Sequence, residues 1–315
     1  MAASQLRTVT RTQGNNEALK TGEVTPRGFR FDFEEVPVLV HAFRRMVRDL
    51  EFDVSEMALT TYLVAKAHGV RFTALPVFLV RGFHHGAILH DPASDIRSPK
   101  DLEGRWVGVN RGYTVTTGVW ARAVLREEYG VDLDRVRWVL SGDEHVAAYR
   151  PPANVEPMVG QRSLEERLTD GELAATIGVN AESPRLSPLI ADPEEAGFAA
   201  LRERGFYPIN HLVVVRDELL AERPELGPEV FDAFARAKRL YVDRLRDGSV
   251  ETPGAADRMY RRVMDETGAD PLPYGIEPNR AVLETLVRHA VDQRILDRPP
   301  VLEELFAEST RDLKA

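Results

Sequence analysis

Residues 52–80 read FDVSEMALTTYLVAKAHGVRFTALPVFLV and contain the pattern of a strand, a helix and a second strand. Ser55 follows a short apolar strand and is placed to cap a helix over 56–67, which a glycine terminates two residues later. Residues 72–80 form an almost unbroken apolar run, which is typical of a parallel strand buried on both faces. The segment therefore predicts an α/β layered fold.

The same pattern continues on both sides of this segment. Residues 6–12 and 29–33 alternate as strands do, and 36–50 carries one apolar stripe at helical spacing, with Pro37 in its first turn. Further strands are expected at 106–110, 136–140, 173–179 and 209–215, and helices at 114–129, 164–170, 217–222, 228–246, 255–266, 279–295 and 300–309.

The order of these elements indicates two lobes. The sequence changes in character after residue 91, and 181–196 is a loop rich in proline, serine and acidic residues. The simplest division places 1–89 and 201–315 in a discontinuous first lobe, with 90–200 inserted as the second. The chain would cross between the lobes twice, and a cleft between such lobes is a common ligand site.

Composition excludes several classes of protein. The 315 residues include 41 Lys and Arg against 50 Asp and Glu, a net charge of −9, which argues against nucleic acid or an anionic membrane as partner. The chain has no cysteine, which rules out disulfides, thiolate metal sites and thiol catalysis. The N-terminus lacks the apolar core of a secretory signal, and no run approaches the length of a membrane span, so a cytoplasmic protein is expected.

Residues 79–88, LVRGFHHGAI, are the most unusual stretch. If the strand continues through them, Arg81 and His85 share one face and His84 takes the other. An arginine and an imidazole that converge at a strand end can bind an aryl carboxylate and move a proton. The alternative is a surface turn with solvated histidines.

A second candidate is the strand-to-helix connection NRGYTVTT at 110–117. Backbone N–H groups at a helix start, threonine hydroxyls and an arginine predict an anion pocket. The residues concerned are Asn110, Arg111, Tyr113, Thr114 and Thr116. The alternative is an ordinary N-cap, which needs only one of those hydroxyls.

Three more positions stand at ends of predicted elements. Ser55, placed as a cap, could also donate to a ligand. Glu34 or Glu35, after the strand at 29–33, could orient an imidazole, although a solvated acid near a helix start is the commoner situation. His211 lies at the start of the returning strand, where a hydrogen-bonded structural role is the usual alternative to catalysis.

Several of these stretches resemble one family. The runs FDFEEVPVLVHAFRRMVRDLEFDVSEMALTTYLVAKAHG and FTALPVFLVRGFHHGAI are similar to the 4,5-dihydroxyphthalate decarboxylase family, and DLEGRWVGVNRGYTVTTGVWARAVLREEYGVDLDRVRWV and GFYPINHLVVVRDELL extend the similarity to about 5–295. The resemblance implies the fold of type 2 periplasmic binding proteins, with two α/β lobes, a hinge and an interlobe ligand cleft. It also implies non-oxidative loss of CO₂ from a dihydroxylated aromatic dicarboxylate, giving 3,4-dihydroxybenzoate (protocatechuate).

The resemblance also implies roles for the candidate residues. Arg81 and Arg111 would hold carboxylates, and the threonines at 114 and 116 would add neutral donors. His85, or its neighbour His84, would protonate the ring carbon, and Glu35 or His211 would handle the phenol. No cofactor is expected, although a divalent ion bound by His and Glu stays open.

Two alternatives accompany this interpretation. One is a cytoplasmic solute-binding protein of the same fold, and the other is an enzyme of that fold acting on a different small carboxylate. Self-association would use the C-terminal helices, where Leu283, Leu286 and Val287 form an apolar stripe, but a place in the core is the favoured explanation for that stripe.

Overall fold

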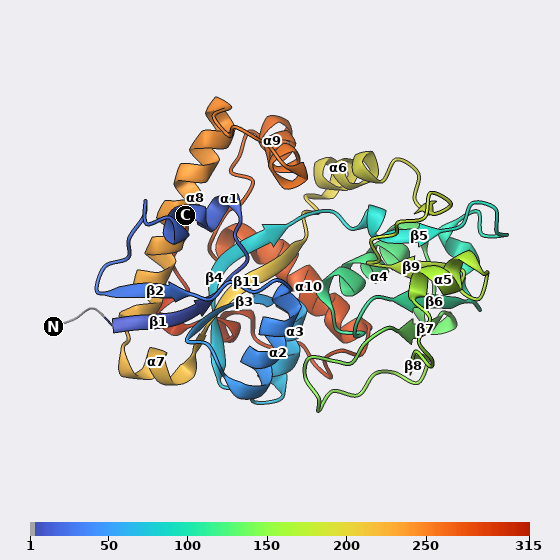
Figure 1. Cartoon of the computed structure of the whole chain (residues 1–315), viewed down its shortest axis with the longest axis horizontal. Coiled ribbons are helices and arrows are strands. Elements are labelled where there is room, and N and C mark those ends of the chain that lie inside the picture. The colour runs from blue at the N-terminus through green and yellow to red at the C-terminus, as the bar shows by residue number, and fades with distance from the viewer. Residues whose placement is uncertain (1–3) are drawn as a thin grey trace. The chain divides into compact units, whose positions relative to one another are not determined.

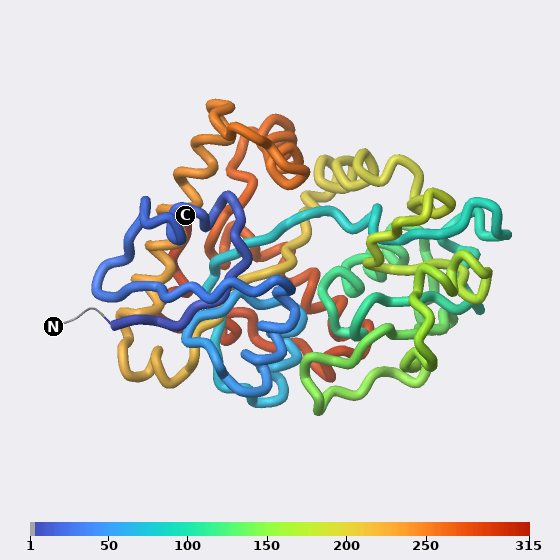
Figure 2. The backbone as a smooth tube through the Cα atoms, in the orientation of Figure 1, coloured from blue at the N-terminus to red at the C-terminus, as the bar shows by residue number. Residues whose placement is uncertain are grey.

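A computed structural model describes residues 4–315, which form two compact units (Figure 1). Of the described residues, unit 1 comprises 4–82, 209–284 and 300–315, and unit 2 comprises 83–208 and 285–299. Figure 2 follows the chain from one unit into the other after residue 82 and back again at residue 209. Each unit is an α/β structure with its own sheet.

The sheet of unit 1 has five strands in the order β2-β1-β3-β11-β4. They are β1 (Ser4–Val9), β2 (Phe29–Phe33), β3 (Val54–Ala58), β4 (Phe72–Arg81) and β11 (Ile209–Arg216). β1 runs parallel to β2 and β3, whereas β11 is antiparallel to both of its neighbours, β3 and β4. The carboxyl ends of β1 to β4 and the amino end of β11 therefore lie at the same edge of the sheet, which we call the carboxyl edge.

Helices of unit 1 pack around this sheet. They are α1 (Gly14–Lys20), α2 (Leu39–Asp49), α3 (Leu59–Ala67), α7 (Asp217–Glu222), α8 (Leu226–Asp247) and α9 (Ala255–Thr267), with 3₁₀ turns at Glu277–Asn279, Leu302–Leu305 and Glu308–Thr310. α2 and α3 contact β3, and α8 packs against α1 and β4. α10 (Arg280–Asp292) starts in unit 1 and ends in unit 2.

The sheet of unit 2 has six strands in the order β10-β5-β9-β6-β7-β8. They are β5 (Ile88–His90), β6 (Trp106–Val109), β7 (Arg137–Leu140), β8 (Val155–Pro157), β9 (Ala175–Ile177) and β10 (Ser187–Pro188). The helices are α4 (Thr116–Tyr129), α5 (Leu164–Thr169) and α6 (Pro193–Arg204), with 3₁₀ turns at His85–Ala87, Pro99–Leu102 and Leu133–Arg135. β6 to β9 pair in parallel, and β5 and β10 add antiparallel strands at one side.

The structure confirms a buried strand at 72–80, because β4 is buried along nearly its whole length. The pairing differs from the parallel one expected, since β4 is antiparallel to its neighbour β11. The helix start predicted at residue 56, with Ser55 as its cap, is wrong. β3 extends to Ala58, so Ser55 lies inside a strand and caps no helix; its hydroxyl donates instead to the carbonyl of Glu56, at 2.7 Å. All five residues of β3 are buried, and the strand pairs with β1 on one side and β11 on the other. This pairing keeps residues 54–58 extended, so the helix starts later than the local pattern predicted.

Other boundaries also differ. Pro37 precedes α2 and is not in its first turn, and the helix expected at 300–309 is a pair of 3₁₀ turns. The loop expected at 181–196 contains β10 and the start of α6. Unit 2 includes residues 83–89, 201–208 and 285–299, which the sequence-based division placed in the first lobe.

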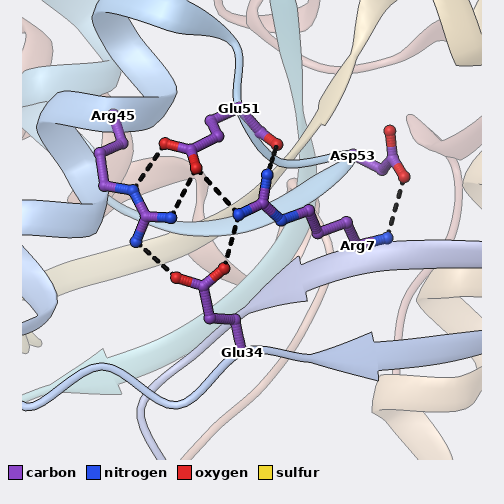
Figure 3. Close-up of polar contacts among 5 residues, drawn as sticks. All are labelled: Arg7, Glu34, Arg45, Glu51 and Asp53. Atoms are coloured by element: carbon purple, nitrogen blue, oxygen red, sulfur yellow. Dashed lines mark hydrogen bonds and ion pairs between the residues drawn. The ribbon is translucent and has the colours of Figure 1, made fainter.

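A network of charged side chains connects strands of unit 1 with one of its helices (Figure 3). The Arg45 guanidinium donates to Glu51 and to Glu34, each at 2.6 Å, and Arg7 donates to the same two carboxylates at 2.8 Å. Both guanidinium groups lie over the ring of Phe52, 4.7 and 5.1 Å from its centre. The network joins β1, the end of β2, α2 and the segment leading to β3.

This network predicts that the free energy of unfolding decreases at acidic pH. Hydrogen bonding from Arg45, aided by Arg7 and opposed by burial, lowers the pKa of Glu51 from 4.5 to about 2. A depressed pKa contributes stability that is complete above the unfolded value and is lost as the pH falls through the folded one, here between about 4.5 and 2. We expect Glu51→Gln to make the free energy of unfolding depend less steeply on pH in that window, as measured by urea unfolding. An unchanged slope would contradict this role.

Candidate functional site

The carboxyl edge of unit 1 brings together residues from distant parts of the chain. Arg11 follows β1, Glu56 lies near the end of β3, and His211 lies near the start of β11. His211 pairs with Ala58, and Glu56 is two residues before Ala58, so both side chains lie on the same face of the sheet. Ligands of open α/β sheets commonly bind at this edge.

Glu56 and His211 form a hydrogen-bonded dyad at this edge. The Nδ1 atom of His211 is 2.6 Å from Oε1 of Glu56. Glu56 is fully buried, whereas the His211 side chain is 19% exposed. The other carboxylate oxygen of Glu56 accepts the N–H of Arg11 at 2.9 Å, and Gln13 donates weakly to both oxygens at 3.4 Å.

This arrangement defines how His211 can act. An ionised carboxylate only accepts hydrogen bonds, so Nδ1 carries the proton that points at Glu56. The second nitrogen, Nε2, is then the atom that exchanges a proton with a ligand. The ring of Phe43 packs edge-on against the imidazole, with centroids 5.3 Å apart and planes at 90°. The imidazole is thus held on two sides, as a proton-transfer group must be.

Arg81 ends β4 at the same edge, where it pairs with Ile209, two residues before His211. Its guanidinium donates to the Oδ1 atom of Asn279 at 2.7 Å, and the residue is only 6% exposed. Asn279 is itself fixed by donation to the carbonyls of Pro273 and Gly275. Arg81 is therefore a rigidly positioned cation at the carboxyl edge of this sheet.

The structure corrects the expectation that Glu34 or Glu35 orients an imidazole. Glu34 binds Arg7 and Arg45, and Glu35 is largely exposed and binds Lys20 at 2.5 Å. The imidazole at this edge is oriented by Glu56, which was not among the site residues predicted from the sequence. One signal for it was present in the sequence, a single acidic residue in the otherwise uncharged segment 54–58. Ser55 lies on the opposite face of β3 from Glu56.

The adjacent histidines His84 and His85 lie in unit 2, because β4 ends at Arg81 and does not continue through 82–88. His84 precedes a 3₁₀ turn that starts at His85, and both are buried. The Nε2 atom of His85 is 2.9 Å from Glu128, which also binds Arg204. Burial alone would raise the pKa of Glu128, but the hydrogen bond and charge of His85, with Arg204, outweigh it and lower that pKa.

His85 is entirely buried in this arrangement. Its Nδ1 atom has no hydrogen-bond partner among residues 4–315. His85 therefore has the carboxylate partner of a proton-transfer residue but not the exposure that His211 has. Its catalytic role, like that of His84, stays a prediction.

The connection between β6 and α4 has the form of an anion site. α4 starts at Thr116 after the N-cap residue Val115, and no side chain caps it, so the ordinary N-cap alternative fails. The backbone N–H groups of Tyr113 and Thr114 and the hydroxyl of Thr114 all donate to one carboxylate, that of Glu144. The side chain of Glu144 therefore occupies the expected anion pocket.

Neighbouring residues support this connection. Asn110 donates to the carbonyl of Gly178 at 2.8 Å and accepts the Ser141 hydroxyl at 3.3 Å. Arg111 has a left-handed backbone, with φ of 70°, and its N–H donates to the same hydroxyl at 2.8 Å. Thr116 is buried in the first turn of α4.

The described residues contain neither a metal-binding cluster nor a membrane-spanning helix. Between residues 4 and 315, no three or more His, Asp or Glu side chains are grouped so that they could hold a metal ion. Across the same residues, every helix is too short or too polar to cross a membrane. Leu283, Leu286 and Val287, the apolar stripe of α10, are all buried.

Comparison with known proteins decides the family. The chain is 30% identical over 289 residues to 4,5-dihydroxyphthalate decarboxylase of Comamonas testosteroni, and the alignment covers 84% of each protein. The chain belongs to the 4,5-dihydroxyphthalate decarboxylase family. A relative of the same name from Pseudomonas putida is 34% identical over 168 residues, 49% of this chain and 65% of that protein. No family model matches the chain.

Solved structures confirm the fold that the family resemblance implied. The desulfurization enzyme DSZB superposes with a TM-score of 0.55 at 15% identity, covering 96% of each chain. The periplasmic aliphatic sulphonate binding protein SsuA of Escherichia coli gives 0.52 at 12% identity, covering 98% of this chain and 99% of that one. Identities this low show a shared fold alone, the two-lobed α/β fold of periplasmic binding proteins.

Proposed function

We propose that this member of the 4,5-dihydroxyphthalate decarboxylase family is a carboxy-lyase that converts 4,5-dihydroxyphthalate to 3,4-dihydroxybenzoate and CO₂. The observation that carries the proposal is the alignment with the Comamonas testosteroni decarboxylase over 84% of both chains. The Glu56–His211 dyad supplies the proton-transfer group that such a reaction requires. The protein acts in the cytoplasm on a small aromatic carboxylate and needs no nucleic acid or membrane partner.

The reaction needs one proton at the ring carbon. The hydroxyl para to the departing carboxylate gives up its proton to water, and the resulting phenolate pushes electron density into the ring. The carbon that bears the carboxylate then takes a proton from Nε2 of His211, which forms a dearomatised intermediate. Cleavage of the C–C bond releases CO₂ and returns the bonding electrons to the ring as a phenolate. Water then returns a proton to the phenolate and another to Nε2 of His211. The net change is the exchange of a carboxylate for a hydrogen.

Glu56 and Arg81 have supporting roles in this scheme. The buried carboxylate of Glu56 holds the imidazole in one orientation and stabilises its protonated form. Arg81 provides a fixed positive charge at the same edge of the sheet for a substrate carboxylate. Because an arginine that held the departing carboxylate too tightly would oppose its loss, Arg81 is assigned to the carboxylate that remains on the ring.

An assay of CO₂ release tests the proposal. The protein, with and without chelator, is incubated with 4,5-dihydroxyphthalate, phthalate and hydroxylated benzoates, and CO₂ and ring products are measured. We expect release from 4,5-dihydroxyphthalate alone and no effect of the chelator. Release that depends on an added divalent ion would overturn the roles given to His211 and Arg81. Tight binding without turnover would indicate a solute-binding protein, and would contradict the proposed function.

A further inference from the structure

Arg11 has a fixed backbone beside the Glu56–His211 dyad. It follows β1 at the carboxyl edge, and its N–H donates at 2.9 Å to the Glu56 oxygen that does not contact His211. Its carbonyl accepts the side-chain amide of Asn16, a residue of α1, also at 2.9 Å. Glu56 and Asn16 are both fully buried. Both backbone polar groups of Arg11 are therefore held by buried side chains, and one of these belongs to the dyad.

The residues on either side of Arg11 are also held in place. The Lys20 ammonium donates to the carbonyl of Thr10 at 2.7 Å and to the hydroxyl of Thr12 at 2.9 Å. The Lys20 side chain is only 10% exposed, so it is itself confined by its surroundings. Supporting contacts of this kind are what a binding residue needs in order to be preorganised.

The guanidinium of Arg11 is left available by these contacts. Arg11 is exposed, and within residues 4–315 its guanidinium makes no hydrogen bond and no ion pair. By contrast, Arg7 and Arg45 are each bound to two carboxylates in the network of Figure 3. A guanidinium that is unpaired, on a fixed backbone at a ligand-binding edge, is suited to an anion from solution.

The charges of Arg11 and Arg81 act on the same side chain. The Tyr260 hydroxyl, on α9, accepts the N–H of Arg81 at 3.5 Å. Burial raises the pKa of Tyr260 to about 12, and the Arg81 N–H and the positive charges of Arg81 and Arg11 oppose this rise. Both arginines therefore direct positive charge to the surroundings of one residue at the carboxyl edge.

The two carboxylates of the substrate need separate partners. The ring carbon that takes the proton from His211 bears the departing carboxylate, so that carboxylate must lie beside the dyad. Arg81 is assigned to the carboxylate that remains, whereas Arg11 is bonded to the dyad directly. We propose that the Arg11 guanidinium binds the carboxylate that leaves as CO₂, and that it thereby favours substrate over product. The inference rests on the proposed function.

An exposed guanidinium suits this role. Solvent screens its charge, so it holds the departing carboxylate less tightly than a buried arginine would and opposes C–C cleavage less. After CO₂ has left, the product has no group for Arg11 to bind. The contact therefore contributes to the affinity for substrate and not to the affinity for product. The ligand class that Arg11 selects is an aromatic acid with a second, adjacent carboxylate.

Three variants test this role. Arg11→Gln removes the charge, and Arg11→Lys keeps the charge without the planar donor pair. Arg71→Gln is the matched control, because Arg71 is an exposed arginine just before β4, at the opposite edge of the same sheet. Calorimetry gives the dissociation constants for the product, 3,4-dihydroxybenzoate, and for phthalate, which has two carboxylates but lacks the para-hydroxyl needed for turnover.

We expect Arg11→Gln to bind phthalate about tenfold more weakly than the wild type, and 3,4-dihydroxybenzoate within about twofold of it. Arg11→Lys should fall between Arg11→Gln and the wild type, and Arg71→Gln should match the wild type for both ligands. The melting temperature should stay the same, because the Arg11 side chain has no partner to lose. Unchanged phthalate affinity, or equal losses for both ligands, would overturn the proposal.

Kinetics separate this inference from the proposed function. Arg11→Gln should raise KM for 4,5-dihydroxyphthalate about tenfold without lowering kcat, because the contact is made in the bound substrate and lost with CO₂. A fall in kcat with KM unchanged would contradict a binding role. If the wild type releases no CO₂, the proposed function fails, while the two dissociation constants still test whether Arg11 recognises the second carboxylate.

Discussion

Replacing His211 by glutamine is expected to lower kcat for CO₂ release from 4,5-dihydroxyphthalate by about 10²- to 10⁴-fold, which is the usual contribution of a positioned general acid. Glutamine can still accept or donate a hydrogen bond, but it cannot deliver a proton to a ring carbon. The fold should persist, because the His211 side chain is partly exposed and its strand is held by backbone pairing with β3 and β4. Steady-state kinetics and the melting temperature measure the two effects separately.

Two other histidine variants make this result specific. His41→Gln is the control, because His41 is an exposed residue of α2 in the same unit, and its kcat should match the wild type. His85→Gln compares the other candidate donor, which is completely buried against Glu128. A large loss of kcat in His85→Gln, with near-normal turnover in His211→Gln, would move the proton donor to unit 2.

Replacing Glu56 by glutamine is expected to lower kcat by about ten- to a hundredfold, the range typical when an orienting partner is lost. A glutamine at this position must direct its NH₂ group either at Nδ1 of His211 or at the N–H of Arg11, and both are donors. The imidazole then loses its fixed orientation and the charge that stabilises its protonated form. Glu56 acts through His211, so it is a positioning residue.

Two measurements distinguish positioning from a purely structural role. The pH profile of kcat in Glu56→Gln should lose or move the limb that reports the imidazole, which a general loss of stability would not do. The double variant with His211→Gln should be no slower than His211→Gln alone, because the two residues act as a unit. Glu17→Gln, at an exposed position of α1, provides the charge-matched control. Additive losses in the double variant would contradict the dyad.

Periodicity predicted much of the fold, for reasons that particular elements make plain. The buried run at 72–80 is β4, and the alternation of Phe29, Phe31 and Phe33 is β2. Each of these patterns is local and reflects which side of an element faces the core. The limits of β3 and the short strands β5, β8 and β10 were missed, because they depend on pairing with distant strands and not on local pattern.

The candidate site was only partly predictable for the same reason. His211 stood out as a histidine at a strand start, but its partner is 155 residues away in sequence. Glu56 meets it only because β11 returns antiparallel between β3 and β4. The donors at Tyr113 and Thr114 were recognisable from the strand-to-helix connection, whereas the Glu144 carboxylate that occupies them has no local signal in the sequence.

The central claim is that this chain removes a carboxylate from 4,5-dihydroxyphthalate by protonating the ring carbon. The most direct test is to run the reaction in D₂O and examine the product by proton NMR. We predict 3,4-dihydroxybenzoate that carries one deuterium at ring position 6, the site of the lost carboxylate, together with an equal amount of CO₂. Recovery of unchanged 4,5-dihydroxyphthalate, or product without deuterium at that position, would contradict the claim.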